Sequence, residues 1–439
     1  MKANTLRDFG FENKNPESGF REFNAKIGDG NRWFSELLQA VHKIKINRPI
    51  TDIMIRENQV VRLGTNKMYV PFHMKFDGNI LKPSDDQLLY LVKSLTNRET
   101  RDIEKVSNIE FDIAIYGNGV YRVNVSRDYL GIAIVIRCLD FEILEFEKLI
   151  YPPFYKHMIK GLVTEVDMPN FAAVEGQKDR ELTLGYINGG GLILHCGPTG
   201  SGKSTHMSSE INYLGNRING AILTYEDPIE QRFLQTSAIV RQFRLGEDIC
   251  PEENLTLFEV IKHNMLRNNP SICMISEART LQEIYHVLEV ANSGHVVFST
   301  MHPKNTTEAL SLLLAAAGEN KQLLSTALHA VVFHYLYHTL RGKLVPLYEV
   351  FIPNRMVKTH IEGNDPKKLS TICRAFYEEN TDGKVIPGCM TFSQHIELMI
   401  GNGTIPENEF ERVTASMRNT LWDYDNFMQR HQSKTKLSA

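Results

Sequence analysis

The chain has 439 residues, a formal net charge of −3, 42% hydrophobic residues and 23% charged residues. This length predicts two or three domains. The small net charge argues against a nucleic-acid coat or a polybasic membrane binder, and no apolar run approaches the ~18–20 residues that a membrane helix needs. The N-terminus lacks a signal-peptide pattern, and the six cysteines form no C-x-x-C pair. We therefore expect a cytoplasmic protein with reduced thiols and no zinc ribbon.

The first part of the chain predicts an arm and a small mixed domain. Residues 1–30 are polar with little periodicity, which is typical of a mobile arm. In residues 31–139, the apolar residues from Trp33 to Val41 have helical spacing. Residues 121–125 and 132–136 alternate on either side of a short polar loop, which predicts a β-hairpin. Residues 31–139 are therefore expected to form an α+β domain.

The rest of the chain predicts a second, larger domain. Residues 140–153 end in Tyr151-Pro-Pro and are interpreted as an inter-domain linker. In residues 154–350 strand and helix signals alternate, as in an α/β domain with a largely parallel sheet. Residues 351–439 are expected to be a helical C-terminal segment, with helices near residues 367–378, 392–400 and 406–417.

A glycine-rich run provides the strongest chemical signal. It fits G-x-x-x-x-G-K-[ST] between a buried strand and a helix, and such a loop points several backbone N–H groups at a phosphate. A lysine within it supplies a cation, and the following serine can bind Mg²⁺. The alternative, a purely structural turn, does not explain this context. The residues expected to bind the nucleotide are Gly197, Pro198, Thr199, Gly200, Ser201, Gly202, Lys203, Ser204 and Thr205.

Polar residues also follow three later strands of the predicted sheet. Glu226 and Asp227 end one strand, Glu277 follows another, and the third runs from His295 to His302. Ligands bind beyond the carboxyl ends of strands in open α/β sheets, so we expect these residues near the loop. Each alone could be a helix cap or a buried polar residue, but together behind a phosphate-binding loop they predict an active site.

Taken in order, these motifs resemble those of the secretion ATPase superfamily, which includes PilT, the DotB/TraJ group and GspE. The resemblance covers roughly residues 35–420. Gly197–Thr205 is similar to the Walker A motif, and an Arg-Val-Asn…Arg segment falls on Arg122 to Arg137. The other matches are residues 225–230 with the Asp box, 272–279 with an atypical Walker B and 293–302 with the His box.

The resemblance implies a fold and a set of roles. The expected fold is α/β: a RecA-like P-loop ATPase domain, preceded by a smaller α+β (PAS-like) domain and followed by a helical segment. ATP and Mg²⁺ are the implied cofactors. The implied catalytic residues are Glu277, Glu226, His302, His295, Arg122 and Arg137. Glu277 would orient the attacking water and His302 would contact the γ-phosphate, whereas bracing its strand is the favoured role of His295. Arg122 and Arg137 would act as arginine fingers. Ser204, Glu226 and Asp227 would hold Mg²⁺, the last two through water. For the two arginines, exposed salt bridges on a strand remain an alternative.

The resemblance also implies partners and a biological role. We expect a homohexamer, peripheral to a bacterial inner membrane, that acts on a membrane-embedded platform protein or coupling complex without binding nucleic acid. A long polar loop at residues 242–254 favours a DotB/TraJ-like role in type IVB secretion or conjugation. Residues 356–361 resemble the pilus-retraction motif only loosely, so PilT-like retraction is the alternative. A nucleic-acid translocase on a RecA-like core and, given Ser276 and Thr280, a non-hydrolysing scaffold also remain open.

Overall fold

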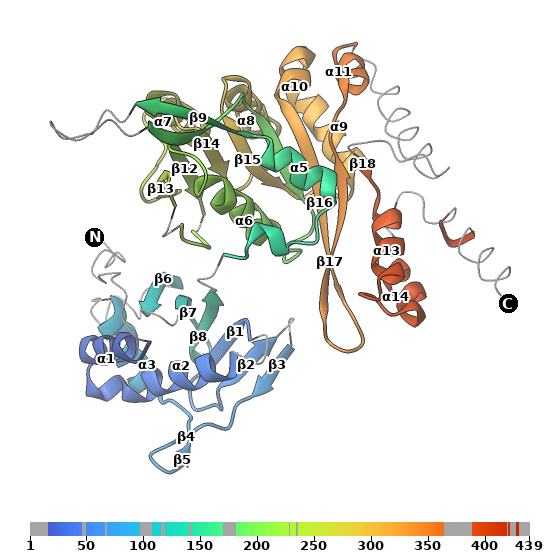
Figure 1. The fold of residues 1–439 in the computed structure, drawn as a ribbon. Coiled ribbons are helices and arrows are strands. Elements are labelled where there is room, and N and C mark those ends of the chain that lie inside the picture. Colours follow the sequence, from blue (N-terminus) through green and yellow to red (C-terminus); the bar gives the residue numbers. More distant parts are fainter. Residues whose placement is uncertain are drawn as a thin grey trace. The chain divides into compact units, whose positions relative to one another are not determined.

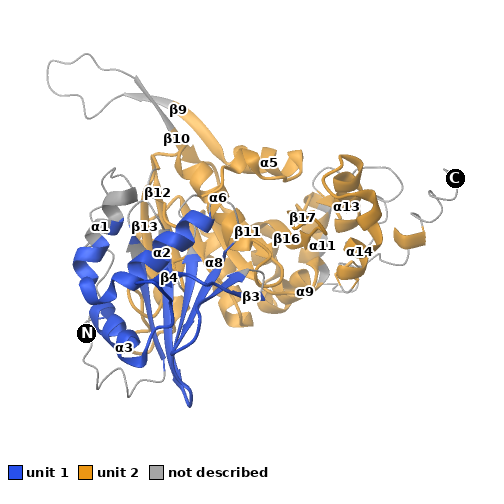
Figure 2. Cartoon of the chain, turned by 90° about the horizontal axis from the view of Figure 1, so that it is seen from below, with its two compact units in different colours: residues 1–142 blue, residues 143–439 orange. Residues whose placement is uncertain are grey.

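The chain forms two compact units in this computed structural model, residues Met1–Glu142 and Ile143–Ala439 (Figure 2). Each unit has its own hydrophobic core and is described by itself. The structure describes residues 16–45, 50–65, 68–96, 108–115, 119–139, 143–169, 181–227, 229–233, 236–363, 389–418, 420–421 and 427–429. Among these residues, none of the helices has both the length and the apolar character needed to cross a membrane.

Unit 1 is a mixed α+β unit built on one antiparallel sheet with the strand order β3-β2-β1-β8-β7-β6. The predicted hairpin is confirmed, since β7 and β8 pair around a turn at Tyr129-Leu130. The helices are α1 (Pro16–Ile27), α2 (Arg32–Lys45) and α3 (Asp85–Thr96), with the short η2 (Asp29–Asn31). The strands are β1 (Asp52–Arg56), β2 (Arg62–Thr65), β3 (Met68–Pro71), β4 (Lys75–Phe76), β5 (Asn79–Ile80), β6 (Asn108–Ile115), β7 (Gly119–Asp128) and β8 (Gly131–Leu139).

The core of unit 1 corrects the prediction of a mobile arm over residues 1–30. Within that segment, α1 is a helix, and Phe20, Phe23 and Ile27 are buried against the rest of the unit. These three residues recur at helical spacing, so one face of α1 removes apolar surface from water. Residues 1–15 lie outside the described part of the chain.

Unit 2 is organised around an eight-stranded sheet with the order β13-β12-β14-β15-β11-β16-β17-β18 (Figure 1). The strands from β13 to β16 run parallel, and β17 and β18 are antiparallel additions at one edge. A separate hairpin pairs β9 (Val163–Pro169) with β10 (Glu181–Ile187). The main strands are β11 (Gly191–Cys196), β12 (Ala221–Glu226), β13 (Ile239–Arg244), β14 (Ile272–Ile275), β15 (Val296–Met301), β16 (Leu328–His338), β17 (Leu344–Phe351) and β18 (Cys389–Met390).

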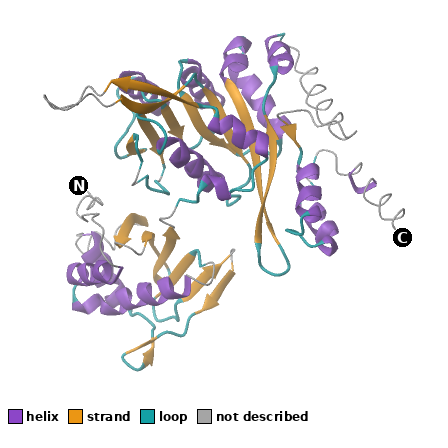
Figure 3. Cartoon of the chain, in the orientation of Figure 1, coloured by secondary structure: helices purple, strands orange, loops and turns teal. Residues whose placement is uncertain are grey.

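Helices cover both faces of this sheet, as Figure 3 shows. The alternating side chains of β11 divide between two cores: Leu192 and Leu194 join one, and Ile193 joins the other. A parallel sheet buried on both faces is the expected result of strand–helix alternation. The helices of unit 2 are α5 (Pro153–Lys160), α6 (Lys203–Gly215), α7 (Leu257–Asn268), α8 (Leu281–Asn292), α9 (Thr306–Ala317), α10 (Lys321–Ala327), α11 (Arg355–Glu362), α13 (Phe392–Gly401) and α14 (Phe410–Ser416), with the short η3 (Phe146–Lys148) and η4 (Glu407–Glu409).

Most of the predicted linker belongs to unit 2. Within residues 143–153, Phe146, Leu149 and Tyr151 are buried in the same core as α6. The prediction of a linker over 140–153 is therefore wrong for residues 143–153, because their aromatic side chains pack into unit 2. At the other end, α13 confirms one predicted C-terminal helix, η4 with α14 confirms another, and the helix predicted near residues 367–378 lies outside the described residues.

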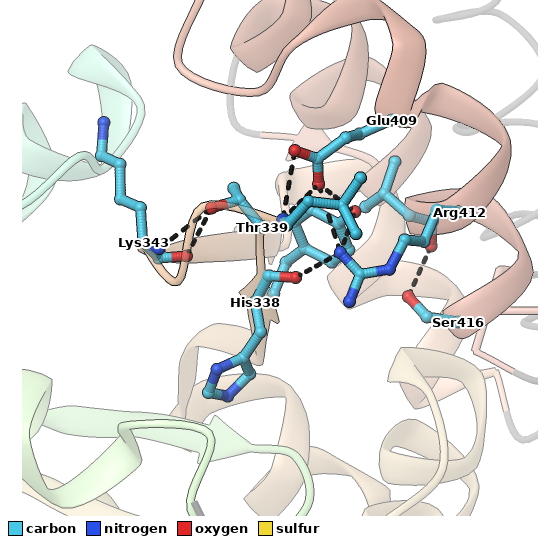
Figure 4. Close-up of polar contacts among 9 residues, drawn as sticks. His338, Thr339, Lys343, Glu409, Arg412 and Ser416 are labelled. Carbon is cyan, nitrogen blue, oxygen red and sulfur yellow. Dashed lines mark hydrogen bonds and ion pairs between the residues drawn. The ribbon is translucent and has the colours of Figure 1, made fainter. Parts of the chain in front are cut away.

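The hairpin of β16 and β17 is held at its far end by η4 and α14 (Figure 4). The buried carboxylate of Glu409 accepts hydrogen bonds from Tyr337 Oη at 2.7 Å and from the backbone N–H of Leu340. Arg412 donates to the carbonyl of His338 at 2.9 Å and pairs with Glu409. Side chains outside the sheet thus satisfy the backbone where the hairpin turns.

Candidate active site

The loop from Gly197 to Gly202 connects the end of β11 to the start of α6, as the sequence predicts. Three of its residues need glycine, because Gly197, Gly200 and Gly202 have φ values of 135°, 79° and 93°. A Cβ atom on Gly197 would also lie 2.4 Å from the carbonyl oxygen of His334. The backbone therefore reaches the N-terminus of α6 in a conformation that directs N–H groups and the positive end of the helix toward one point.

Lys203 is the first residue of α6, and its side chain folds back over the loop. Its Nζ donates to the carbonyls of Gly197 at 2.8 Å and Pro198 at 3.0 Å. Burial lowers the pKa of Lys203 to about 8, which makes its charged form costly until an anion lies nearby. A phosphate group would supply that anion.

Glu277, Arg279 and His302 form a second group, after β14 and β15. Glu277 Oε2 accepts from Arg279 Nη2 at 2.9 Å, and its Oε1 lies 3.3 Å from His302 Nε2. His302 Nδ1 is 3.5 Å from Lys203 Nζ, so this histidine joins the acidic group to the loop. Burial and the nearby Lys203 charge lower the pKa of His302, so its imidazole is neutral near pH 7.

Glu226 ends β12 and is almost fully buried. Its Oε1 accepts from Thr224 Oγ1 at 2.7 Å and Gln242 Nε2 at 3.0 Å. Burial raises its pKa to about 7 despite these two donors. Asp227, the next residue, is exposed, and Pro228 of the same motif lies outside the described residues.

The residues of the loop fit the phosphates of a bound nucleotide. Ser201 Oγ is buried and has no hydrogen-bond partner among the described residues, so it is a donor that a phosphate oxygen can use. Ser204, in the first turn of α6, and the carboxylates of Glu226 and Asp227 are oxygen ligands of the kind that Mg²⁺ takes beside phosphates and water. In the described part of the chain, no cluster of three or more His, Cys, Asp or Glu side chains could hold a metal ion.

Three other predicted site residues lie elsewhere. His295 precedes β15, and its Nδ1–H donates to the carbonyl of Pro270, 2.7 Å away. It is thus at the opposite end of the strand from His302, about 20 Å away at ~3.3 Å per residue. Of the two roles expected for His295, this position fits the brace and does not fit the catalytic group. Arg122 and Arg137 belong to unit 1, where they are cross-strand neighbours on β7 and β8.

The sequence alone did not indicate the side chains that support this site. Thr224 and Gln242 hold Glu226, and Thr300 Oγ1 donates to the carbonyl of Ser276, next to Glu277. Arg279 follows Glu277 by two residues, but its pairing with that carboxylate becomes visible only in the structure. Thr224 and Thr300 lie in apolar strands, where a threonine is ordinary, so no pattern distinguished them.

The fold and this site define a RecA-like P-loop ATPase. The family model described as "Type II/IV secretion system protein" matches residues 164–365, which include all four motifs. The chain is 26% identical over 356 residues to the type IV pilus retraction ATPase PilT of Pseudomonas aeruginosa, covering 78% of this chain and 92% of that protein. It is also 31% identical over 205 residues to the type II secretion system protein E of Xanthomonas campestris, covering 47% of this chain and 31% of that one. Together these matches support membership of the type II/IV secretion ATPase superfamily and ATP hydrolysis by this chain.

Solved structures show the same fold. The pilus retraction motor PilT with bound ADP superposes with a TM-score of 0.64 at 23% identity, covering 85% of this chain and 98% of that chain. The ATPase DotB of Yersinia pseudotuberculosis superposes with a TM-score of 0.66 at 20% identity, covering 87% and 94%. The predicted fold class is confirmed.

Proposed function

We propose that the chain is the hexameric ATPase of a type IVB secretion or conjugative transfer system, of the DotB/TraJ kind. Mg·ATP bound by Gly197–Thr205 would be hydrolysed with Glu277 orienting the water, since phosphoryl transfer needs positioning and charge neutralisation more than covalent chemistry. Movement between the two units would then act on a platform protein or coupling complex at the inner membrane of a bacterium.

The observation that supports this assignment is the segment Gln242–Asn254, which contacts Glu226. Its first three residues belong to β13, which corrects the start of the predicted loop, and the loop follows from Leu245. Gln242 donates to the Glu226 carboxylate, and the N–H of Leu245 donates to the Glu226 carbonyl at 2.8 Å. Glu247 and Asp248 then pair with Arg244, which keeps the segment compact. A DotB-like loop in this place would couple nucleotide state to a partner surface.

Pilus retraction is the second candidate, because the match to PilT extends over 92% of that protein. Deletion of the gene in its own host distinguishes secretion or conjugation from pilus retraction. The deletion strain is complemented with the native chain or with Lys203→Ala. For a secretion or conjugation motor, transfer of DNA or protein is lost while surface pili and twitching stay unchanged. Loss of twitching with an excess of pili would instead assign retraction. Light scattering of the purified chain with nucleotide tests the expected hexamer.

A further inference from the structure

A cluster of buried rings contacts the phosphate-binding loop from inside unit 2. We call it the ring cluster and define it as His195, His206, His334, Tyr151 and Tyr348, all less than a tenth exposed. The members come from β11, α6, β16, the segment before α5, and β17. Ring centroids of neighbours lie between 4.6 and 6.4 Å apart. The hydrolysis chemistry described above uses none of these side chains.

His206 joins this cluster to the loop, and its contacts define its tautomer. Its Nδ1 lies 2.7 Å from the carbonyl oxygen of Gly202, which can only accept, so Nδ1 carries the hydrogen. Its Nε2 lies 2.6 Å from Tyr348 Oη. Because Nδ1 carries the hydrogen, Nε2 presents a lone pair and accepts from the Tyr348 hydroxyl. Tyr348 therefore keeps the donor of His206 on the Gly202 side.

The Gly202 carbonyl controls the direction of one phosphate-binding group. Gly202 has a φ of 93° and precedes Lys203, and the peptide that joins them is planar. Its carbonyl accepts both the Nδ1–H and the backbone N–H of His206, the latter at 3.0 Å. Holding this oxygen toward α6 directs the N–H of Lys203 the opposite way, toward the point where the loop receives a phosphate. If the peptide rotated, a carbonyl would face the anion instead.

We propose that His206, oriented by Tyr348, is a positioning residue for nucleotide binding that holds the Gly202–Lys203 peptide in its phosphate-binding orientation. It acts through the backbone and does not touch the nucleotide. The position of the first glycine agrees with this role, because Gly197 packs against the backbone of His334, another member of the cluster. The proposal concerns ATP binding and holds for any transport system that the ATPase powers.

Substitutions that separate the two nitrogens of His206 test the proposal. His206→Leu removes both, whereas His206→Asn keeps an amide N–H near the position of Nδ1. Dissociation constants for Mg·ADP are measured by calorimetry on the full chain, beside KM, kcat and the melting temperature. We expect His206→Leu to weaken binding about five- to tenfold, the value of one hydrogen bond, and to raise KM with little change in kcat. His206→Asn should recover most of this affinity.

Tyr348→Phe completes the test, because it removes only the hydroxyl. It should weaken binding two- to fivefold alone and add little in the His206→Leu background, since both changes remove the same restraint. His286→Leu, at another histidine in a helix of unit 2, is the control and should not change affinity. Native affinity in Tyr348→Phe, or a His206→Asn variant as weak as His206→Leu, would overturn the proposal. Tyr348→Phe decides alone if His206→Leu does not fold.

Discussion

We propose that Glu277 acts on water rather than on the nucleotide. Its carboxylate contacts His302 and Arg279 at the edge of the sheet, whereas the Gly197–Thr205 loop is the proposed site of the phosphates. We expect Glu277→Gln to bind ATP within about threefold of the native chain and to hydrolyse it roughly 10²–10⁴-fold more slowly. Nucleotide titration and phosphate release measure the two quantities separately. A folded variant that does not bind ATP would show that Glu277 supports the site structurally.

Glu226 carries a pH dependence of stability whose sign follows from its burial. The folded pKa is about 7 against an ordinary value of 4.5, so between these values the folded state holds a proton that the unfolded state has released. Stability of the nucleotide-free chain therefore falls as pH rises from about 4.5 to 7, by up to about 3 kcal/mol. Glu226→Gln lacks this ionisation and should be more stable than the native chain at pH 8 and nearly equal at pH 5.

Urea unfolding of both chains without Mg²⁺ or nucleotide measures that difference. Asp227→Asn, next in sequence and exposed, is the control for the loss of one carboxylate from the same motif. An equal gap between Glu226→Gln and the native chain at both pH values would mean that Glu226 does not titrate in this range.

At the residue scale, the sequence predicts the residues of the candidate site better than the side chains that hold them in place. Glu277 and His302 follow apolar strands, and parallel strands bring such residues to one edge, so their proximity was predictable. His295 shares a motif with His302, but the two lie at opposite ends of β15. Only the observed start of β15 at Val296 shows this. The ring cluster depends on side chains far apart in the sequence, such as Tyr151 and Tyr348, and no local pattern joins them.

The end of the β16–β17 hairpin shows how one buried side chain can hold an element in place. Glu409 accepts from Tyr337 and from the backbone N–H of Leu340, and α14 positions it through Arg412 (Figure 4). Glu409→Ala leaves both donors without this partner, so we expect a loss of about 1–3 kcal/mol and faster amide exchange at Leu340. Glu411→Ala, in the neighbouring helix α14 and with an exposed side chain, should change neither. Unchanged exchange at Leu340 would contradict this account.

Elements were predictable where periodicity was strong. The β7–β8 hairpin alternates over both strands, and α13 begins with a capping box at Thr391 and Gln394. The helix α1 was not predicted, because three apolar residues in a polar stretch specify a helix only when a core covers them. The same holds for residues 143–153, whose aromatic side chains are buried in a core that α6 completes.

At the scale of the whole molecule, the open question is what unit 1 contributes to turnover. Arg122 and Arg137 face each other across β7 and β8, and each also pairs outward: Arg122 with Asp112 at 3.6 Å and Arg137 with Asp52 at 3.3 Å. The two differ in exposure, since 61% of the Arg137 side chain but only 10% of the Arg122 side chain is accessible. The salt bridges that were the alternative to an arginine-finger role are thus present. Because its side chain is more exposed, Arg137 is the better placed of the two to reach a phosphate.

We therefore expect Arg137→Ala to lower ATP turnover with ATP affinity within a few-fold of native, because an arginine finger stabilises charge that develops only during transfer. Such a finger is worth about a thousandfold or more in other P-loop enzymes, and the loss should be smaller if Arg122 shares the role. Arg122→Ala should also lower turnover, and Asp52→Asn, which keeps Arg137 but removes its partner, should not.

Residues 143–439, which retain both cores of unit 2, should bind ATP yet hydrolyse it slowly. Phosphate release from this fragment as fast as from the whole chain would show that the arginines of unit 1 serve only their own sheet.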